Sequence, residues 1–309
     1  MRYTTLDLKT HSNDNVHTLY GKIYIPIGTP KGTVQIIHGM SEHMELYDEF
    51  MSLLAQNGFV SLIHDHLGHG KTAGSTNALG FFAEKNGDEL LIRDAHKFAC
   101  EFLSDYSGIP HVLFGHSMGS FIGRIYAQRY PAMCDRLILS GTGGHVKGAA
   151  LGLALTKAGD SLYSRSHCPE RVQKIFFDFC NVQFRDDKNP YAWTTSDTDV
   201  QRAHTNDKYY NFVFYYKAMN DVVMLSEKCN SKQWYDNFRT DLPTLIISGE
   251  KDPVGDHGRG VLEVYKKIKN TGAKDVSLKI YKDCRHELLH EKNRREVEAD
   301  ILKWLSHRI

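Results

Sequence analysis

The chain has 309 residues, 41% of them hydrophobic, and a formal net charge of +1 at pH 7. This length accommodates one large α/β domain with an insertion, and the balanced charge predicts no nucleic-acid partner. No apolar run reaches about 18 residues, so we expect no membrane-spanning helix. The first residues lack the apolar core of a signal peptide. Six cysteines without a C-x-x-C pair favour free thiols in the cytoplasm.

The first segments of the chain alternate polar and apolar residues or run apolar, as β-strands do. Residues 2–8 and 16–26 predict a β-hairpin with its turn at 12–15. Residues 32–39 contain a β-branched run, end at a glycine and predict a buried strand. Helical spacing of apolar residues follows at 46–57. We therefore expect the hairpin at an antiparallel edge of a larger sheet.

Strand and helix patterns then alternate along the chain. Residues 59–65 predict a strand, residues 88–103 a helix with one apolar stripe, and residues 110–115 another strand. A helix is expected at 118–130 and a strand at 135–141. This alternation is typical of parallel strands that are joined by crossover helices.

The same alternation returns near the C-terminus. Residues 243–249 and 276–281 predict strands, and residues 257–269 and 290–307 predict helices. Together these elements favour an α/β protein with a mostly parallel central sheet and helices on both faces.

Residues 142–236 interrupt this pattern. They contain no clear strand–helix repeat and are rich in aromatic residues, as at 212–216. We expect a helical cap inserted into a core that consists of residues 1–141 and 237–309. The aromatic residues suit an acyl pocket but equally suit the cap's own core, so substrate-binding residues stay unassigned. The apolar stretch 148–156 is a candidate for transient contact with lipid aggregates.

A candidate nucleophile, Ser117, lies in a G-x-S-x-G pattern at residues 115–119. The pattern follows a predicted strand and leads directly into a predicted helix, which is the setting of a nucleophile elbow. The two glycines permit a tight turn whose strained backbone directs the hydroxyl into the site. We therefore predict that Ser117 is a catalytic nucleophile.

A serine hydroxyl needs a base, and the base needs an orienting acid. In a sheet of this kind the chain order is serine, acid, histidine, each after a strand. Asp252 follows the seventh predicted strand and His286 follows the eighth. Glu250 and Asp256 are competing acids, whereas Asp241 precedes its strand and fits poorly. We predict His286 as the base and Asp252 as its partner.

The oxyanion hole is expected to use two backbone amides. One belongs to the residue after the nucleophile, Met118, and the other to the loop after the first parallel strand. That loop is residues 38–43, and we assign the second amide to Met40. Gly39 permits close approach of the backbone there.

Residues 286–290, His-Glu-Leu-Leu-His, match the H-E-x-x-H pattern of zinc metalloproteases. Zinc requires both histidines on one helical face and a third ligand. His286 follows a strand too closely, and no third histidine follows at the required spacing. We therefore expect no metal and no cofactor, and assign no role to Glu287 or His290.

Five segments together resemble α/β-hydrolases of the monoacylglycerol lipase and lysophospholipase group, also described as serine aminopeptidase S33-like. They are HGMSEHMELYDEF (38–50), DHLGHGKT (65–72), FGHSMGS (114–120), SGEKDPVG (248–255) and CRHELLHE (284–291). The resemblance implies the α/β-hydrolase fold, with Ser117, His286 and Asp252 as catalytic residues. It also implies a small acyl ester substrate beneath the cap.

We therefore expect a serine hydrolase that cleaves carboxylic esters through an acyl-enzyme, with monoacylglycerols or lysophospholipids as substrates. Two alternatives stay open. One is an aminopeptidase similar to proline iminopeptidases, in which Asp160, Asp178, Asp199 or Asp207 of the cap would hold a free amino terminus. The other is a non-catalytic relative of the same fold. The sequence does not determine the oligomeric state.

Overall fold

The central element of the fold is an eight-stranded sheet in the order β1-β2-β4-β3-β5-β6-β7-β8. The computed structural model describes residues 3–144, 158, 161, 174 and 177–307. The strands are β1 (Tyr3–His11), β2 (Thr18–Pro26), β3 (Gly32–Ile37), β4 (Phe59–His64), β5 (His111–His116), β6 (Arg136–Ser140), β7 (Thr244–Gly249) and β8 (Val276–Tyr281). Strands β3 to β8 pair in parallel, and the β1–β2 hairpin adds an antiparallel edge. The predicted fold class and the edge hairpin are confirmed.

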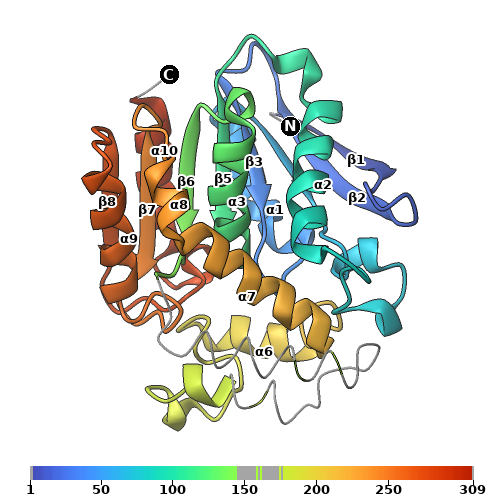
Figure 1. Ribbon diagram of the computed structural model, residues 1–309, viewed down its shortest axis with the longest axis vertical. Coiled ribbons are helices and arrows are strands. Elements are labelled where there is room, and N and C mark those ends of the chain that lie inside the picture. The colour runs from blue at the N-terminus through green and yellow to red at the C-terminus, as the bar shows by residue number, and fades with distance from the viewer. Residues whose placement is uncertain (1–2, 145–157, 159–160, 162–173, 175–176, 308–309) are drawn as a thin grey trace.

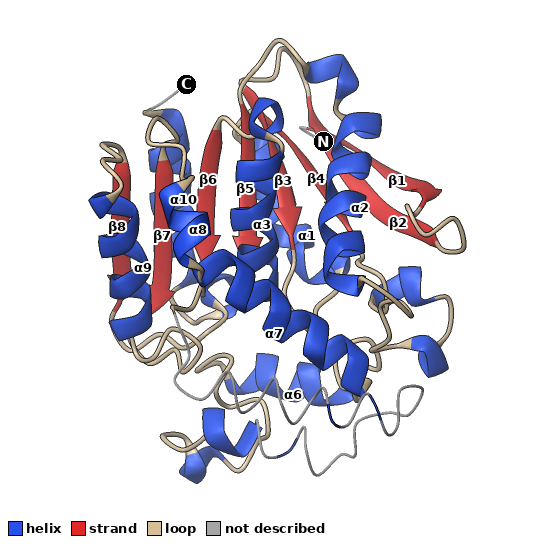
Figure 2. Cartoon of the chain, in the orientation of Figure 1, coloured by secondary structure: helices blue, strands red, loops and turns tan. Residues whose placement is uncertain are grey.

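Helices cover both faces of this sheet (Figures 1 and 2). α1 (Asp48–Gln56) and α10 (Arg294–Ser306) pack on one face. α2 (Gly87–Phe102), α3 (Met118–Arg129) and α9 (Arg259–Asn270) pack on the other. Covering both faces explains why β3, β5 and β7 are buried along their whole length and are rich in β-branched and leucine residues.

The last helix begins four residues later than predicted. The sequence predicts a helix from residue 290, but a short 3₁₀ turn occupies Leu288–His290 and α10 begins at Arg294. Glu291 lies between them, and its carboxylate accepts a hydrogen bond from the Arg285 backbone N–H (2.6 Å). This contact ties the chain to the preceding loop, so the regular helix starts only beyond it.

The segment between β6 and β7, residues 142–236, is called the insertion below. Its described part contains α6 (Thr198–Asn206), α7 (Tyr216–Asn230) and α8 (Lys232–Asp236). Figure 1 shows that it lies across the end of the sheet where the parallel strands finish. The apolar stretch 148–156, singled out in the sequence, lies outside the described residues.

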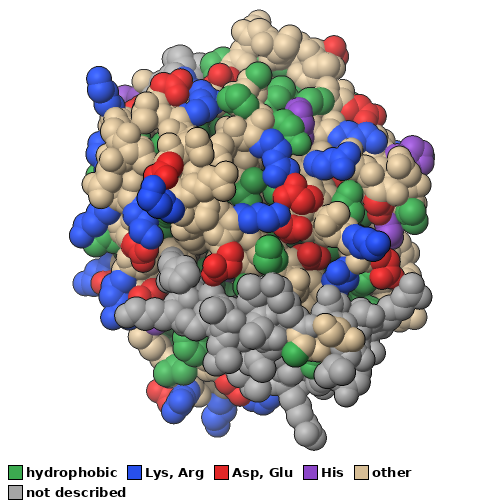
Figure 3. Space-filling view, viewed as in Figure 1, with side chains coloured by type: hydrophobic (Ala, Val, Ile, Leu, Met, Phe, Trp, Pro, Cys, Tyr) green, Lys and Arg blue, Asp and Glu red, His purple; other side chains and the backbone are tan. Residues whose placement is uncertain are grey.

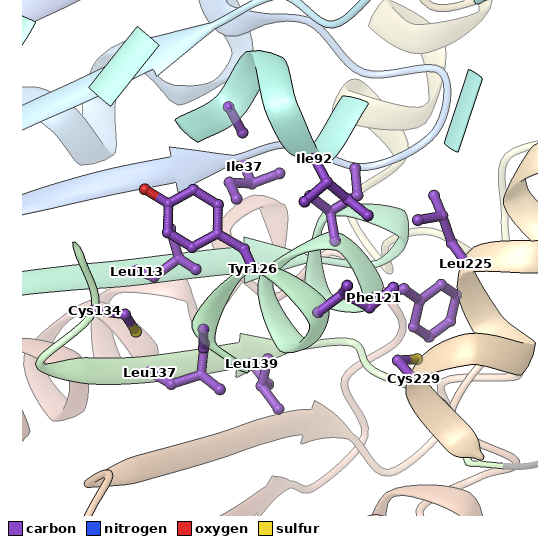
Figure 4. Close-up of a cluster of buried hydrophobic side chains, with 14 of the residues drawn as sticks. Ile37, Ile92, Leu113, Phe121, Tyr126, Cys134, Leu137, Leu139, Leu225 and Cys229 are labelled. Atoms are coloured by element: carbon purple, nitrogen blue, oxygen red, sulfur yellow. The ribbon is translucent and has the colours of Figure 1, made fainter. Parts of the chain in front are cut away.

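Helix α3 packs between the sheet and helix α7 of the insertion. Leu113 of β5 packs beneath this helix, and Phe121 extends from it toward Leu225 and Cys229 of α7 (Figure 4). The buried Arg124 of the same helix donates hydrogen bonds to the Asn230 side chain (3.1 Å), the Tyr235 hydroxyl (2.9 Å) and the Cys229 carbonyl. The C-terminal part of the insertion is therefore held on α3 by both apolar and polar contacts.

The order of the strands fixes where a site can form. The chain runs from β3 to its neighbour β4, and then crosses back to place β5 on the other side of β3. Loops that leave β3 and β5 therefore diverge at adjacent carboxyl ends, which is where open α/β sheets bind ligands. Residues 38–43 and Ser117 lie in these two loops.

The face of the molecule seen in Figure 3 carries charges of both signs. On the face in Figure 3, lysine and arginine side chains alternate with acidic ones. Within the described residues, no helix combines the length and the apolar character that crossing a bilayer requires.

Candidate active site

Ser117 occupies a strained turn between β5 and α3. Its backbone has φ 53° and ψ −120°, a conformation that costs free energy for a residue with a side chain. The Ser117 N–H donates to the Ser140 carbonyl of β6 (2.9 Å), and the Ser117 carbonyl accepts from the Ser120 N–H (2.8 Å). The turn therefore has the geometry expected of a nucleophile elbow.

The glycines on either side of Ser117 leave no space for a side chain. A Cβ on Gly115 would lie 2.4 Å from the Gly119 carbonyl oxygen, and a Cβ on Gly119 would lie 2.0 Å from that of Ile37. Both obstacles are backbone atoms, which cannot rotate away. The G-x-S-x-G spacing is thus a steric requirement of packing the start of α3 against the end of β3.

The predicted base and acid are in contact. His286 Nδ1 lies 2.9 Å from Asp252 Oδ1, and both side chains are almost completely buried. Burial of the His286 ring opposes its protonated form, but the Asp252 carboxylate outweighs this and raises the pKa of His286. Burial likewise disfavours the Asp252 carboxylate, yet His286 and the Val254 N–H hold its pKa below the usual value. Nδ1 therefore carries a proton toward Asp252, and Nε2 is left to accept one.

Residues 140 and 141, at the end of β6, contact both the Ser117 backbone and the His286 ring. The Ser140 carbonyl accepts from the Ser117 N–H, and Gly141 follows with φ 60°. A Cβ on Gly141 would lie 2.9 Å from Cε1 of His286 and 3.1 Å from Cε1 of His116. The segment between β8 and α10, residues 282–293, carries His286 and is called the histidine loop below. The elbow and the histidine loop thus contact the end of β6 from two sides.

The competing acids face away from the base. Asp256 pairs with Arg259 at the surface (2.7 Å), and Asp241 lies beside Arg239 (3.4 Å). Glu250 accepts a hydrogen bond from the Asp283 N–H (3.1 Å) at an exposed position. Of the acids considered from the sequence, the structure places Asp252 against His286.

The loop after β3 lies directly beside the elbow. A Cβ on Gly39 would be 3.0 Å from the Ser117 Cβ, so the backbone next to Met40 passes close to the serine. Met118 begins α3 and its side chain is buried. The two amides that the sequence nominates, those of Met40 and Met118, therefore belong to adjacent loops at this end of the sheet.

Comparison with known proteins agrees with this architecture. Residues 28–293 match the family described as "Serine aminopeptidase, S33". The chain belongs to this family. It is 25% identical to a monoglyceride lipase of Rattus norvegicus, over 98% of this chain and 91% of the relative. A carboxyl esterase of Bacillus coagulans, solved in complex with glycerol, superposes with a TM-score of 0.91 at 30% identity, covering 98% of each chain.

A monoglyceride lipase of Saccharomyces cerevisiae, solved with a substrate analogue, shares the fold at a TM-score of 0.77 and 22% identity. The match covers 99% of this chain and 96% of the Saccharomyces cerevisiae lipase. The protein is thus an α/β-hydrolase of the monoacylglycerol lipase-like group and a carboxylic ester hydrolase.

This ester hydrolase has a buried acid beside the elbow that sequence reasoning left unassigned. Glu42 accepts hydrogen bonds from the Gly39 N–H and the Tyr47 hydroxyl (2.7 Å). Burial raises the pKa of Glu42 to about 7, and burial lowers the pKa of the neighbouring His116 to about 3. The 3.5 Å contact between them is therefore not an ion pair at neutral pH. Glu42 fixes the loop that carries Met40.

The H-E-x-x-H residues of the hydrolase divide between two hydrogen-bond networks. His286 faces Asp252, whereas His290 Nδ1 lies 2.8 Å from Glu287. Among the described residues, His204, Glu287 and His290 bring three potential ligand atoms within 4.8 Å of one another. They form hydrogen bonds to each other, to the Tyr210 hydroxyl and to the backbone. No sequence signal indicated His204, because it belongs to the irregular insertion.

The insertion acids named for the aminopeptidase alternative have other partners. Asp178 pairs with Lys174 (2.7 Å) and Asp199 with Arg202 (3.1 Å), all at exposed positions. Asp207 accepts from His43 Nε2 (2.8 Å) and so links the insertion to the loop after β3. Asp160 lies outside the described residues.

The packing at the elbow leads to a matched pair of glycine substitutions. We expect Gly119→Ala to lower the free energy of unfolding by about 1–3 kcal/mol, because its Cβ meets backbone. We also expect it to reduce ester hydrolysis roughly 10²-fold, because the start of α3 must move. Gly123→Ala on the same helix places its Cβ at an ordinary 3.5 Å from Leu113 and should retain activity. Urea unfolding and esterase assays measure both effects, and equal behaviour of the two variants would contradict the steric account.

Proposed function

We propose that this protein hydrolyses monoacylglycerols or lysophospholipids through an acyl-enzyme on Ser117. The observation that carries the proposal is the buried His286–Asp252 contact, on a loop that meets the elbow at Gly141. In this mechanism His286 Nε2 takes the proton of the Ser117 hydroxyl as its oxygen attacks the ester carbonyl. The protonated His286 then gives this proton to the leaving alcohol.

Two backbone amides would stabilise the oxyanion that forms on the carbonyl oxygen. We assign them to Met40 and Met118, whose loops lie against each other beside Ser117. Water, deprotonated by His286, would then attack the acyl-enzyme and release the fatty acid. Removing one such donor typically costs about 10²–10³ in rate. Among the ordinary amino acids only proline lacks the backbone N–H, and proline also fixes φ, so such a variant would change the loop as well as the donor.

The choice of substrate draws on the relatives. The named relatives include monoglyceride lipases, and the esterase of Bacillus coagulans was solved with glycerol. Glycerol is the alcohol that a monoacylglycerol releases. We also propose that the insertion serves as a cap over residues 1–141 and 237–309, since it lies across the carboxyl ends of the strands (Figure 1).

The cytoplasm is the proposed compartment. Cys100, Cys134, Cys180, Cys229 and Cys284 are free thiols, and free thiols are typical of reducing compartments. Transient contact with lipid aggregates would bring water-insoluble esters to the site, and we propose no nucleic-acid partner or cofactor.

A substrate panel tests the proposed function. We expect hydrolysis of monoacylglycerols or lysophospholipids and of p-nitrophenyl acyl esters, and no cleavage of aminoacyl anilides. Ser117→Ala should abolish turnover and labelling by a fluorophosphonate, because no other side chain would supply the attacking oxygen. Cleavage of aminoacyl anilides without ester hydrolysis would favour the aminopeptidase alternative, and turnover by the Ser117→Ala variant would refute the nucleophile.

The His286–Asp252 contact leads to an expected pH dependence. A general base must be neutral, and the pKa of His286 is raised, so kcat/KM should fall as the pH drops through a pKa above the ordinary value of about 6.5. Asp252→Asn removes the charge that raises this pKa. The acid limb should then move to lower pH, and the rate at pH 8 should fall about 10⁴-fold.

The matched control for this substitution is Glu250→Gln, which changes an exposed acid on the same loop. It should leave both the rate and the pH profile unchanged. An acid limb at the same pH in wild type and Asp252→Asn would show that Asp252 does not act on the base.

A further inference from the structure

The loop that carries His286 is bound on its far side by the insertion. The Glu287 N–H donates to the Thr194 carbonyl (2.7 Å), and the Thr195 hydroxyl donates to the His290 carbonyl (2.8 Å). The Trp193 ring lies over the His286 ring, with centroids 5.1 Å apart. These contacts join two segments separated by about ninety residues of sequence, so the insertion holds the histidine loop on the side opposite Asp252.

The centre of this interface is the Glu287 carboxylate, which is almost completely buried. One oxygen accepts from the Tyr210 hydroxyl, and the other faces His204 Nε2 and His290 Nδ1, each at 2.8 Å. Two of these three groups, His204 and Tyr210, belong to the insertion, and their rings stack with centroids 3.8 Å apart. The carboxylate is therefore a meeting point for the insertion and the histidine loop.

The negative charge of Glu287 is balanced by a positive charge on His290. His290 Nε2 faces the Leu46 carbonyl (3.1 Å) while Nδ1 faces Glu287, so both ring nitrogens must carry protons. Burial opposes this cation, but Glu287 outweighs the effect and raises the pKa of His290 to about 9. The Glu42 carboxyl is the other acid that acts on this pair. Removing one partner of a buried ion pair leaves an unpaired buried charge and strongly lowers the free energy of unfolding. The pair therefore favours the one arrangement in which both partners meet.

This cluster is coupled to His286 because Glu287 is the next residue in the chain. Glu287 follows His286 directly, so the two Cα atoms are about 3.8 Å apart. Fixing both the backbone amide and the side chain of Glu287 leaves the His286 backbone little freedom to turn. Small displacements matter at this point, because a shift of about 1 Å in a reacting group can cost 10²-fold in rate.

We propose that Glu287 is a positioning residue: through His204 and Tyr210 of the insertion it holds His286 in the orientation that meets Asp252. The insertion is then a structural part of the catalytic geometry as well as a cover for the substrate. This inference rests on the proposed role of His286 as the general base.

A set of conservative variants tests this role. Tyr210→Phe removes one donor to Glu287 and nothing else, and Glu287→Gln keeps the shape but removes the charge. We expect kcat for a short p-nitrophenyl ester to fall about tenfold and about 10²-fold, respectively, with KM changed less than threefold. Because both act through one contact, the double variant should lose no more than Glu287→Gln alone.

The matched control is Tyr191→Phe. This buried tyrosine packs edge-to-face against Tyr210, but its hydroxyl donates to Asn211 within the insertion (2.7 Å) and not to the histidine loop. It should lower the melting temperature as much as Tyr210→Phe does, while kcat stays within twofold of wild type. A purely structural role for the cluster would make the two tyrosine variants alike in kcat.

The pH profile separates positioning from general loss of stability. If His286 moves away from Asp252, its pKa returns toward the ordinary value, so the acid limb of kcat/KM should move to lower pH in Tyr210→Phe. In Glu287→Gln it should also move to lower pH, because the Glu287 charge itself helps to raise the pKa of His286. Unchanged kcat and an unchanged acid limb in folded samples of both variants would overturn the positioning role. That result, with an inactive Ser117→Ala, would leave the proposed function intact, whereas an active Ser117→Ala would refute the proposed function itself.

Discussion

The close contact between the start of α3 and the end of β3 is the constraint on which the site depends. Gly119 lies so near the Ile37 carbonyl that no side chain fits, and Gly115 is closed off by Gly119 in the same way. This contact forces Ser117 into its strained conformation and brings Gly39 to its side. The proposed nucleophile and oxyanion amides thus follow from one backbone packing arrangement.

A second constraint acts from the insertion. The histidine loop packs on one side against Asp252 and the end of β6, and on the other against Thr194, His204 and Tyr210. The first side sets the charge state of His286, and the second limits its movement. Both sides are buried, so hydrogen bonds and charges there are stronger than at a surface. With the proposed cap role of the insertion, substrate access and the orientation of His286 would be linked through the same segment.

Sequence reasoning predicted the sheet, its helices and the contact between His286 and Asp252, because these depend on local patterns and on chain order. It placed the start of α10 too early, because the Glu291–Arg285 contact that delays the helix has no local signal. It assigned no role to Glu42, Glu287 or His290. Glu287 meets His204 and Tyr210 of the insertion, which only the folded chain brings to it. Glu42 has nearby partners, Gly39 and Tyr47, but no motif marks a carboxylate in that role.

The proposed mechanism transfers an acyl group from the substrate to Ser117. The most direct measurement is rapid acid quenching during turnover of a p-nitrophenyl ester, followed by mass spectrometry of the intact protein and of its peptides. We expect one acyl group per chain, located on the peptide that contains residues 115–119 and lost over time at neutral pH. Turnover without any acylated protein, or an acyl group on another peptide, would refute Ser117 as the nucleophile.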